Sequence, residues 1–256
     1  MKEKRGQVTI FIILAIVIVA VGVLVYLFYP KIQSSFSLNT DDPSTYLRNC
    51  IRGDLEGVVN DVSLRGGNLN PGDYFLYDDE KISYLCYTNQ NYRPCVMQYP
   101  LLEQHISEEI KINIIENVDS CFDGLKENFE NKGYEVKLKK GETIVELLPK
   151  RVIVKFEHEL SLKKGENVLR YGGNDNRMIS VALNNNLYEL ISITNSILNF
   201  EATDGDAEVI TYMDYYRDLK VEKKKQSEGT TIYVLTDKNN GNKFQFASRS
   251  YVLSSW

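Results

Sequence analysis

Residues 8–29 form a long apolar stretch without a charged residue, and this stretch restricts the possible folds more than any other feature. As a helix it would be about 33 Å long, which matches a hydrocarbon core of about 30 Å. Only Thr9, Gly22 and Tyr26 interrupt its apolar character, so a buried amphipathic helix is the weaker alternative. The sequence therefore predicts a transmembrane helix at residues 8–29.

The charges that flank this stretch predict its orientation. Lys2, Lys4 and Arg5 precede it, whereas Lys31 is the nearest positive charge after it. Because positive residues stay on the cytoplasmic side, we expect a cytoplasmic basic leader at residues 1–7 and an extracytoplasmic C-terminal domain. A cleaved secretory signal would have a shorter apolar region and a small-residue cleavage site. The prediction is a single-pass protein of the cell membrane.

The segment Lys4–Ile10, KRGQVTI, leads directly into the apolar stretch. It resembles the archaeal class III signal, which is type IV prepilin-like. The resemblance implies that a prepilin-type peptidase cuts after Gly6 and leaves Gln7 as the mature N-terminus, with the apolar helix retained. Phe11 stands where bacterial pilins have a glutamate, and Pro30 would interrupt a continuous shaft helix.

The rest of the chain resembles uncharacterised surface proteins of small-genome archaea. The resemblance lies in a cysteine early in the first outer helix (Cys50), the turn at Gly66 and Gly67, a tyrosine-rich hairpin, and a long helix that ends near Cys121. It implies a place on the cell surface and no particular activity.

Hydrophobic periodicity predicts an α+β domain at residues 43–256, joined to the apolar stretch by a polar stalk at residues 30–42. The domain forms either one body or two lobes, 43–133 and 134–256. A period of 3.6 changes to a period of two at Tyr134, which predicts two helices and a hairpin followed by a β-meander. The expected elements are a helix at 43–63, a hairpin at 74–77 and 82–87, a helix from Pro100 to Gly133, meander strands at 134–138, 143–148 and 152–162, one or two further helices at 187–200 and 208–216, and a last hairpin at 230–237 and 243–250.

Four cysteines in an extracytoplasmic domain predict two disulfides. Cys86 and Cys95 flank a short polar loop, and Cys50 and Cys121 lie on the core faces of their predicted helices, so we pair them accordingly. A zinc site is the alternative, but the chain has no C-x-x-C and neither histidine lies at a ligand-like spacing from a cysteine pair. A reactive thiol would need a base and exposure.

Catalytic and metal motifs are sparse. No nucleotide-binding, zinc-protease or hydrolase signature occurs. The run Ser161–Lys164 matches S-x-x-K but enters a predicted hairpin turn, and His158 falls on the apolar face of its strand, as a hydrogen-bonded core histidine would. Asp204, Asp206 and Glu208 could gather around Ca²⁺ or cap a helix. We therefore predict no catalytic residue, no metal site and no cofactor.

The most suggestive residues for binding are aromatic and lie in the hairpin and the loop after it. An exposed set of tyrosines could contact a glycan or a partner protein, and the alternative is that they pack against the first two helices. The residues singled out for this surface are Tyr77, Tyr84, Tyr87 and Tyr92.

Net charge narrows the partners further. The chain has a formal net charge of −5. Because the basic residues of the leader precede the apolar stretch, the part that follows is more negative still, and nucleic acid is excluded as a partner. The expected partners are the membrane, surface proteins or glycans, and a prepilin-type peptidase. The expected function is that of a membrane-anchored binding or envelope-structural module without catalytic activity, with an anchored envelope hydrolase or a minor pilin-like subunit as alternatives.

Overall fold

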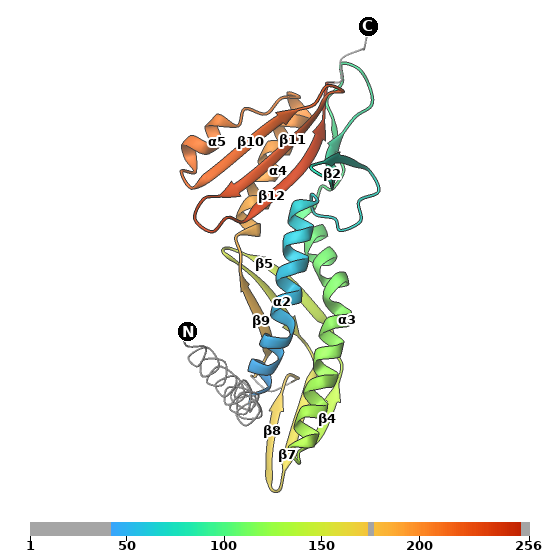
Figure 1. The fold of residues 1–256 in the computed structure, drawn as a ribbon, viewed down its shortest axis with the longest axis vertical. Helices are drawn as coiled ribbons and strands as arrows, with labels where there is room; N and C mark the ends of the chain where they lie inside the picture. The colour runs from blue at the N-terminus through green and yellow to red at the C-terminus, as the bar shows by residue number, and fades with distance from the viewer. Residues whose placement is uncertain (1–41, 174–176, 252–256) are drawn as a thin grey trace, which may run out of the picture. The chain divides into compact units, whose positions relative to one another are not determined.

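The computed structural model describes residues 42–173 and 177–251 (Figure 1). The chain divides into two units at Pro43–Ser44. The predicted leader, the apolar stretch at 8–29, the stalk up to residue 41 and the Gly6–Gln7 processing site all lie outside the described residues.

The predicted fold class needs a correction. The described fold is α+β, but none of its helices is both long and apolar enough to cross a membrane. The longest, α3 (Leu102–Asn131), has 30 residues, and charged side chains such as Glu103, Glu116 and Glu127 recur on its exposed side. Such a helix buries one stripe of side chains against a protein core and leaves its opposite side in water.

Helix α2 (Pro43–Leu64) and α3 form because apolar residues recur on one face of each. In α2 the fully buried apolar residues are Leu47, Ile51, Leu55 and Val59, at steps of four, and Val62, three residues later. Gly66 and Gly67 end the helix with φ values of 73° and 88°, which only glycine adopts easily. In α3 the buried stripe is formed by Leu102, Ile106, Ile110, Ile114, Val118, Cys121, Phe122, Leu125 and Phe129.

The largest sheet combines the early hairpin with the end of the chain. Its order is β1-β2-β12-β11-β10, with β3 beside β2. Strands β2 and β12 are parallel and the other neighbours are antiparallel, so the sheet is mixed. Its strands are β1 (Tyr74–Tyr77), β2 (Glu80–Tyr87), β3 (Val96–Met97), β10 (Leu219–Lys225), β11 (Thr230–Asp237) and β12 (Lys243–Arg249).

The predicted β-meander is right for the pairing of residues 143–148 with the strand that begins near 152 and for the turn at 163–166, but wrong for the turn at 139–142. Two three-stranded sheets replace it, with orders β4-β7-β8 and β5-β6-β9. The chain does not turn back at residues 139–142, because the N–H of Glu157 donates to the carbonyl of Glu142 (2.9 Å) and keeps both segments side by side. The reversal comes at Lys150, which has a φ of 63°. The strands are β4 (Glu135–Lys139), β5 (Thr143–Leu148), β6 (Arg151–Phe156), β7 (Glu159–Lys164), β8 (Asn167–Tyr171) and β9 (Ile179–Asn184).

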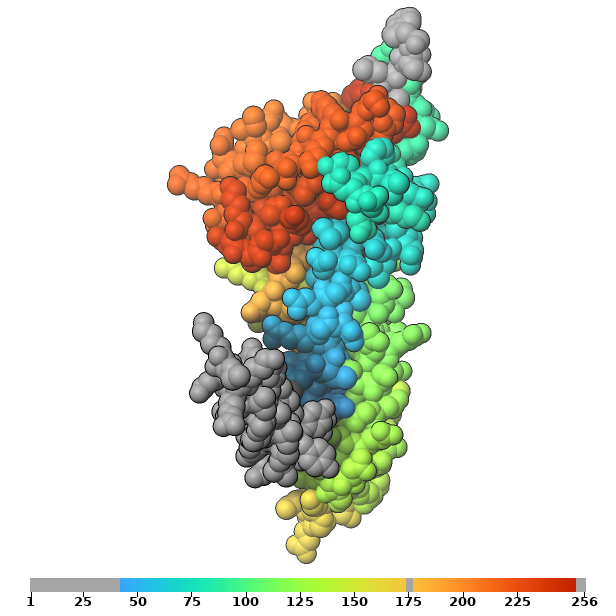
Figure 2. Space-filling view, viewed as in Figure 1, coloured from blue at the N-terminus to red at the C-terminus, as the bar shows by residue number. Residues whose placement is uncertain are grey.

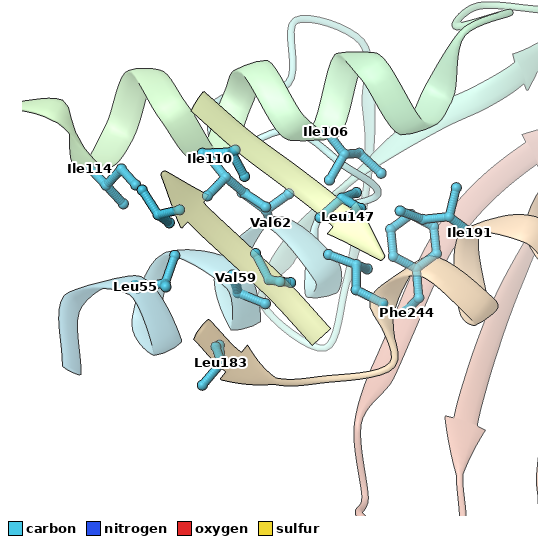
Figure 3. Packing of buried hydrophobic residues seen from close by; sticks show 14 of the residues in the cluster. Leu55, Val59, Val62, Ile106, Ile110, Ile114, Leu147, Leu183, Ile191 and Phe244 are labelled. Atoms are coloured by element: carbon cyan, nitrogen blue, oxygen red, sulfur yellow. The ribbon is translucent and has the colours of Figure 1, made fainter. Parts of the chain in front are cut away.

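Helix α4 (Leu187–Thr203) connects the sheets, and the short α5 (Ile210–Tyr215) packs beside β10. Helix α4 contacts β12 and β2 of the large sheet, β5 and β6, and also α3. Figure 3 shows where these elements meet: Ile106 of α3, Leu147 of β5, Ile191 of α4 and Phe244 of β12 belong to one buried cluster. One apolar core therefore runs through residues 44–251 as far as the structure describes them.

Candidate functional site

The four cysteines form two disulfides, Cys50–Cys121 and Cys86–Cys95, the pairing predicted from the sequence. The first joins α2 to α3, with a Cα–Cα distance of 6.0 Å, and the second closes the loop between β2 and β3, with 5.3 Å. Cys121 is buried, but Cys50 is exposed rather than on the core face of its helix. Position 50 lies beside the buried stripe of α2 and faces α3.

Strands β1 and β2, at one edge of the large sheet, pack side chains against residues of β11 and β12. Phe75, Tyr77 and Tyr84 contact a second, smaller apolar cluster formed by Ile82, Ile232, Val234 and Ala247. Figure 2 shows the blue-green atoms of this region against the orange and red atoms of the last strands. Two of the four singled-out tyrosines are thus half-buried packing residues rather than a free platform.

Their hydroxyl groups are also engaged. Lys224 Nζ donates to the hydroxyl of Tyr77 (2.7 Å), and this bond raises the pKa of the lysine. The hydroxyls of Tyr84 and Thr230 share a hydrogen bond of 2.8 Å. Burial raises the pKa of the Tyr84 phenol, so that this ring is neutral and Lys224 is charged at neutral pH.

Tyr87 and Arg249 extend this group. The rings of Tyr84 and Tyr87 meet edge to face with their centroids 4.9 Å apart. Arg249 Nη1 donates to the Tyr87 hydroxyl (3.2 Å), and its guanidinium lies 5.7 Å from the centre of that ring. We call Tyr77, Tyr84, Tyr87, Lys224 and Arg249 the tyrosine cluster.

Tyr92 lies in the adjoining disulfide-closed loop and is 62% exposed, with a φ of 57°. Together with the tyrosine cluster it combines fixed aromatic rings with two cations. Such a surface can stack on a sugar ring or accept an acidic group, since an arginine guanidinium binds carboxylates in a fixed geometry. Tyr84 and Tyr87 are in ring contact, Tyr77 packs on the same apolar cluster as Tyr84, and Tyr92 lies in the loop closed by the Cys86–Cys95 disulfide.

The acidic segment around Asp206 is held by lysines. Lys223 Nζ lies 2.5 Å from Asp206 Oδ1, and Lys225 Nζ lies 3.1 Å from the same oxygen. Burial acts to raise the pKa of Asp206, but the bonds from both lysines outweigh it and lower that pKa. Within the described ranges, no group of three or more His, Cys, Asp or Glu residues is placed to hold a metal ion.

The histidines and the S-x-x-K run do not form a reactive group. His105 Nε2 lies 2.8 Å from Asn68 Oδ1, and its ring stacks on Tyr99. His158 is in the core as predicted, but neither ring nitrogen has a hydrogen-bond partner among the described residues. Lys164 donates to the carbonyl of Lys132 (2.9 Å), and the run lies in a strand rather than at a helix start.

A buried carboxylate escaped the sequence analysis. Glu201 of α4 is 2% exposed and accepts hydrogen bonds from the Tyr233 hydroxyl, from Ser248 Oγ (3.0 Å) and from the Ala207 N–H (3.1 Å). Ser248 Oγ also lies 3.7 Å from Cys95 Sγ. A glutamate late in an apolar helix was the available signal, but partners 32 and 47 residues away could not be assigned.

Two grooves lie elsewhere. One, of about 540 Å³, lies at the sheet β4-β7-β8 and is lined in part by Lys137, Lys139, Glu159, Arg170 and Tyr171. The other, of about 580 Å³, lies between the start of α3 and strand β5. Sequence analysis missed both, because each depends on which strands lie side by side.

No protein-family model, curated protein or solved structure matches the chain. Likeness of fold therefore assigns no known activity to this chain.

Proposed function

We propose that this chain is an extracytoplasmic binding module of the cell surface, without catalytic activity of its own. The observation that carries the location is that all four cysteines are paired in disulfides. Disulfides persist in oxidising compartments and are rare in the cytoplasm, where thiols are kept reduced. The bond between α2 and α3 links positions 71 residues apart, so it constrains the fold as a whole.

The tyrosine cluster and Tyr92 support the binding role. Side chains that are already fixed lose little conformational entropy on association, and tyrosine and arginine are the residues that contribute most at interfaces. Lys224 and Arg249 supply positive charge on a chain that is net negative. The partner that fits this surface is a surface protein or glycan that presents an acidic group beside an apolar or sugar-ring face.

The location can be tested by thiol labelling of cells that express the protein. Denatured protein should show no free thiol before reduction. After treatment of intact cells with a reductant that does not cross membranes, an impermeant maleimide should label the cysteines. Free thiols without reduction, or labelling only after cell lysis, would contradict the proposed location.

Processing at Gly6–Gln7 belongs to the same proposal and rests on the likeness of the leader to class III signals. Mass spectrometry of the protein purified from its native cells should then show a chain that begins at Gln7. A chain that still begins at Met1 or Lys2 would remove the involvement of a prepilin-type peptidase.

The binding role can be tested with cell-envelope preparations and three variants. Tyr92→Ala and Arg249→Gln should each weaken binding by about tenfold, which is typical of an interface hot spot. Tyr215→Ala is the matched control, since Tyr215 is 81% exposed on α5. Equal binding by all three variants, with unchanged thermal stability, would show that the tyrosine cluster is not the contact surface.

A further inference from the structure

The groove between α3 and β5 runs along the outer edge of that strand. Val145 and Leu147 point into the core, whereas Glu146 and Leu148 alternate with them on the other face of the sheet. The groove is lined by residues from both faces of the sheet. Because only the edge of a strand borders both faces, the groove lies at the edge of β5. Its walls are formed by Pro100, Leu101, Leu102, Glu103, Gln104, Ser107, Val145, Glu146, Leu147, Leu148 and Asn195.

Strand β5 is an edge strand of the sheet β5-β6-β9, and β6 is its sheet neighbour in the described part of the chain. In an antiparallel edge strand, alternate residues direct their N–H and C=O groups away from the sheet, where they are free to pair with another chain. The edge strand β10 is protected by lysines, with the sequence LKVEKKK. Strand β5, TIVELL, has one charged residue, and Glu146 is already paired with Lys155 at 2.6 Å.

The groove combines an apolar floor with a buried hydrogen-bond acceptor that has no donor in the described structure. Leu102 and Leu147 are 1% and 3% exposed, and Figure 3 shows Leu147 within the buried cluster. Asn195 of α4 contributes a buried Oδ1 atom that has no hydrogen-bond partner in the described structure. At the rim, Leu101 is 70% exposed, and the exposed carboxylate of Glu103 forms no ion pair with any described residue.

We propose that this groove binds an extended polypeptide segment of a partner protein, which pairs with β5 as an added strand. The backbone of such a segment supplies N–H and C=O groups for the free edge, and one of its donors can satisfy Asn195 Oδ1. Its alternate side chains reach the apolar floor, since side chains in a strand repeat every two residues. A lysine or arginine in the segment lies opposite Glu103, so the occupant is apolar and basic.

Other occupants fit these groups less well. A helix satisfies its own backbone groups and would leave the edge of β5 unpaired. An anionic ligand would meet the carboxylate of Glu103, which forms no ion pair with any described residue, and be repelled. The groove shares no residue with the tyrosine cluster, so it adds a second site to the proposed binding role.

The test uses the full chain and two synthetic probe peptides of six residues, the length of β5. One is acetylated and amidated Lys-Val-Thr-Val-Lys-Val, and the other has glutamate in place of both lysines. The lysine peptide should slow hydrogen exchange of alternate backbone amides in residues 143–148, because those amides become paired. The glutamate peptide should bind roughly tenfold more weakly, as like charges meet at the rim.

A charge-reversed variant separates this groove from general charge effects. Glu103→Lys should weaken binding of the lysine peptide by about tenfold and strengthen binding of the glutamate peptide. Glu116→Lys makes the same charge change on an exposed position of α3 outside the groove and should leave both affinities unchanged. Equal effects of the two variants would overturn the proposal. So would a lack of exchange protection in β5 at peptide concentrations up to about 1 mM.

The two proposals fail separately. Tyr92→Ala should leave peptide binding unchanged if the groove is the peptide site. Glu103→Lys should leave envelope binding through the tyrosine cluster unchanged. Loss of peptide binding in Tyr92→Ala would place the peptide at the tyrosine cluster and overturn the groove assignment.

Discussion

The imidazole of His158 lies nearly parallel to the ring of Phe122, with the ring centroids 4.1 Å apart and 11° between the planes. Phe156 meets the same imidazole edge-on, and the histidine is 1% exposed. Both ring nitrogens lack a partner within the described residues, so the side chain acts as an aromatic core residue. This arrangement favours the neutral imidazole, because a buried cation without a partner is costly.

Stability should therefore depend on His158 in weakly acidic solution. Burial lowers its pKa, Asp119 acts to raise it and Lys140 acts to lower it further. Because the pKa in the folded state is below the unfolded value of about 6.5, the stabilisation is complete above that pH. It is lost progressively as the pH falls below about 6.5 towards the folded value. Urea unfolding at a series of pH values measures this loss.

Substitution of the histidine checks the assignment. His158→Phe should flatten the pH dependence between about pH 7 and 5, because the group that takes up the proton on unfolding is gone. His105 is the control, because burial lowers its pKa as well. Its Nε2 atom is hydrogen-bonded to Asn68, whose amide in turn donates to Ser83. His105→Phe should retain the part of the pH dependence that belongs to His158. An unchanged profile in His158→Phe would contradict the burial argument.

The buried pair Tyr233 and Glu201 gives a second prediction. Burial and the adjacent carboxylate raise the pKa of the Tyr233 phenol, so the phenol stays a hydrogen-bond donor. Tyr233→Phe removes one of the donors of Glu201 and should destabilise the fold by about 1–3 kcal/mol. Tyr215→Phe, at an exposed position, should change the free energy of unfolding by less than about 0.5 kcal/mol. Equal stability of the two variants in urea would show that Glu201 does not depend on this hydroxyl.

Local signals in the sequence were sufficient for the helices. The four-residue steps of Leu47, Ile51 and Leu55 predict α2, and the structure places that helix at Pro43–Leu64. The described fold is α+β, as periodicity indicated. The predicted meander failed at its first turn because strand periodicity does not specify a partner: β4 pairs with β7, with Val136 opposite Leu162, and not with β5.

The candidate site was only partly predictable. Tyr77 of β1 and both Tyr84 and Tyr87 of β2 lie in the predicted hairpin, and the rings of Tyr84 and Tyr87 are in contact. The burial of Tyr77 and Tyr84 depends on Ile232 and Val234 of β11, about 150 residues later in the chain. The parallel pairing of β2 with β12 that joins these segments has no local signal in the sequence.

Removal of the disulfides should have unequal effects. The Cys50–Cys121 bond spans 71 residues and the Cys86–Cys95 bond spans 9. By loop-closure entropy the first stabilises the fold by about 4 kcal/mol and the second by about 2.5 kcal/mol. The paired variants Cys50→Ser/Cys121→Ser and Cys86→Ser/Cys95→Ser should differ in this order in chemical unfolding. A larger loss from the short loop would indicate that the 86–95 loop holds native contacts that the entropy argument omits.

Gly172 gives the sharpest steric prediction. It has a φ of 75°, and a Cβ atom built there would lie 1.9 Å from the carbonyl oxygen of His158. Gly165, in the β7–β8 turn, has a φ of 62° and open space around it. Gly165→Ala should therefore cost about 1 kcal/mol for its left-handed backbone alone. Gly172→Ala should cost about 3 kcal/mol or more, because the His158 backbone must also move. If thermal unfolding shows equal losses, the close approach of residues 158 and 172 is not present in solution.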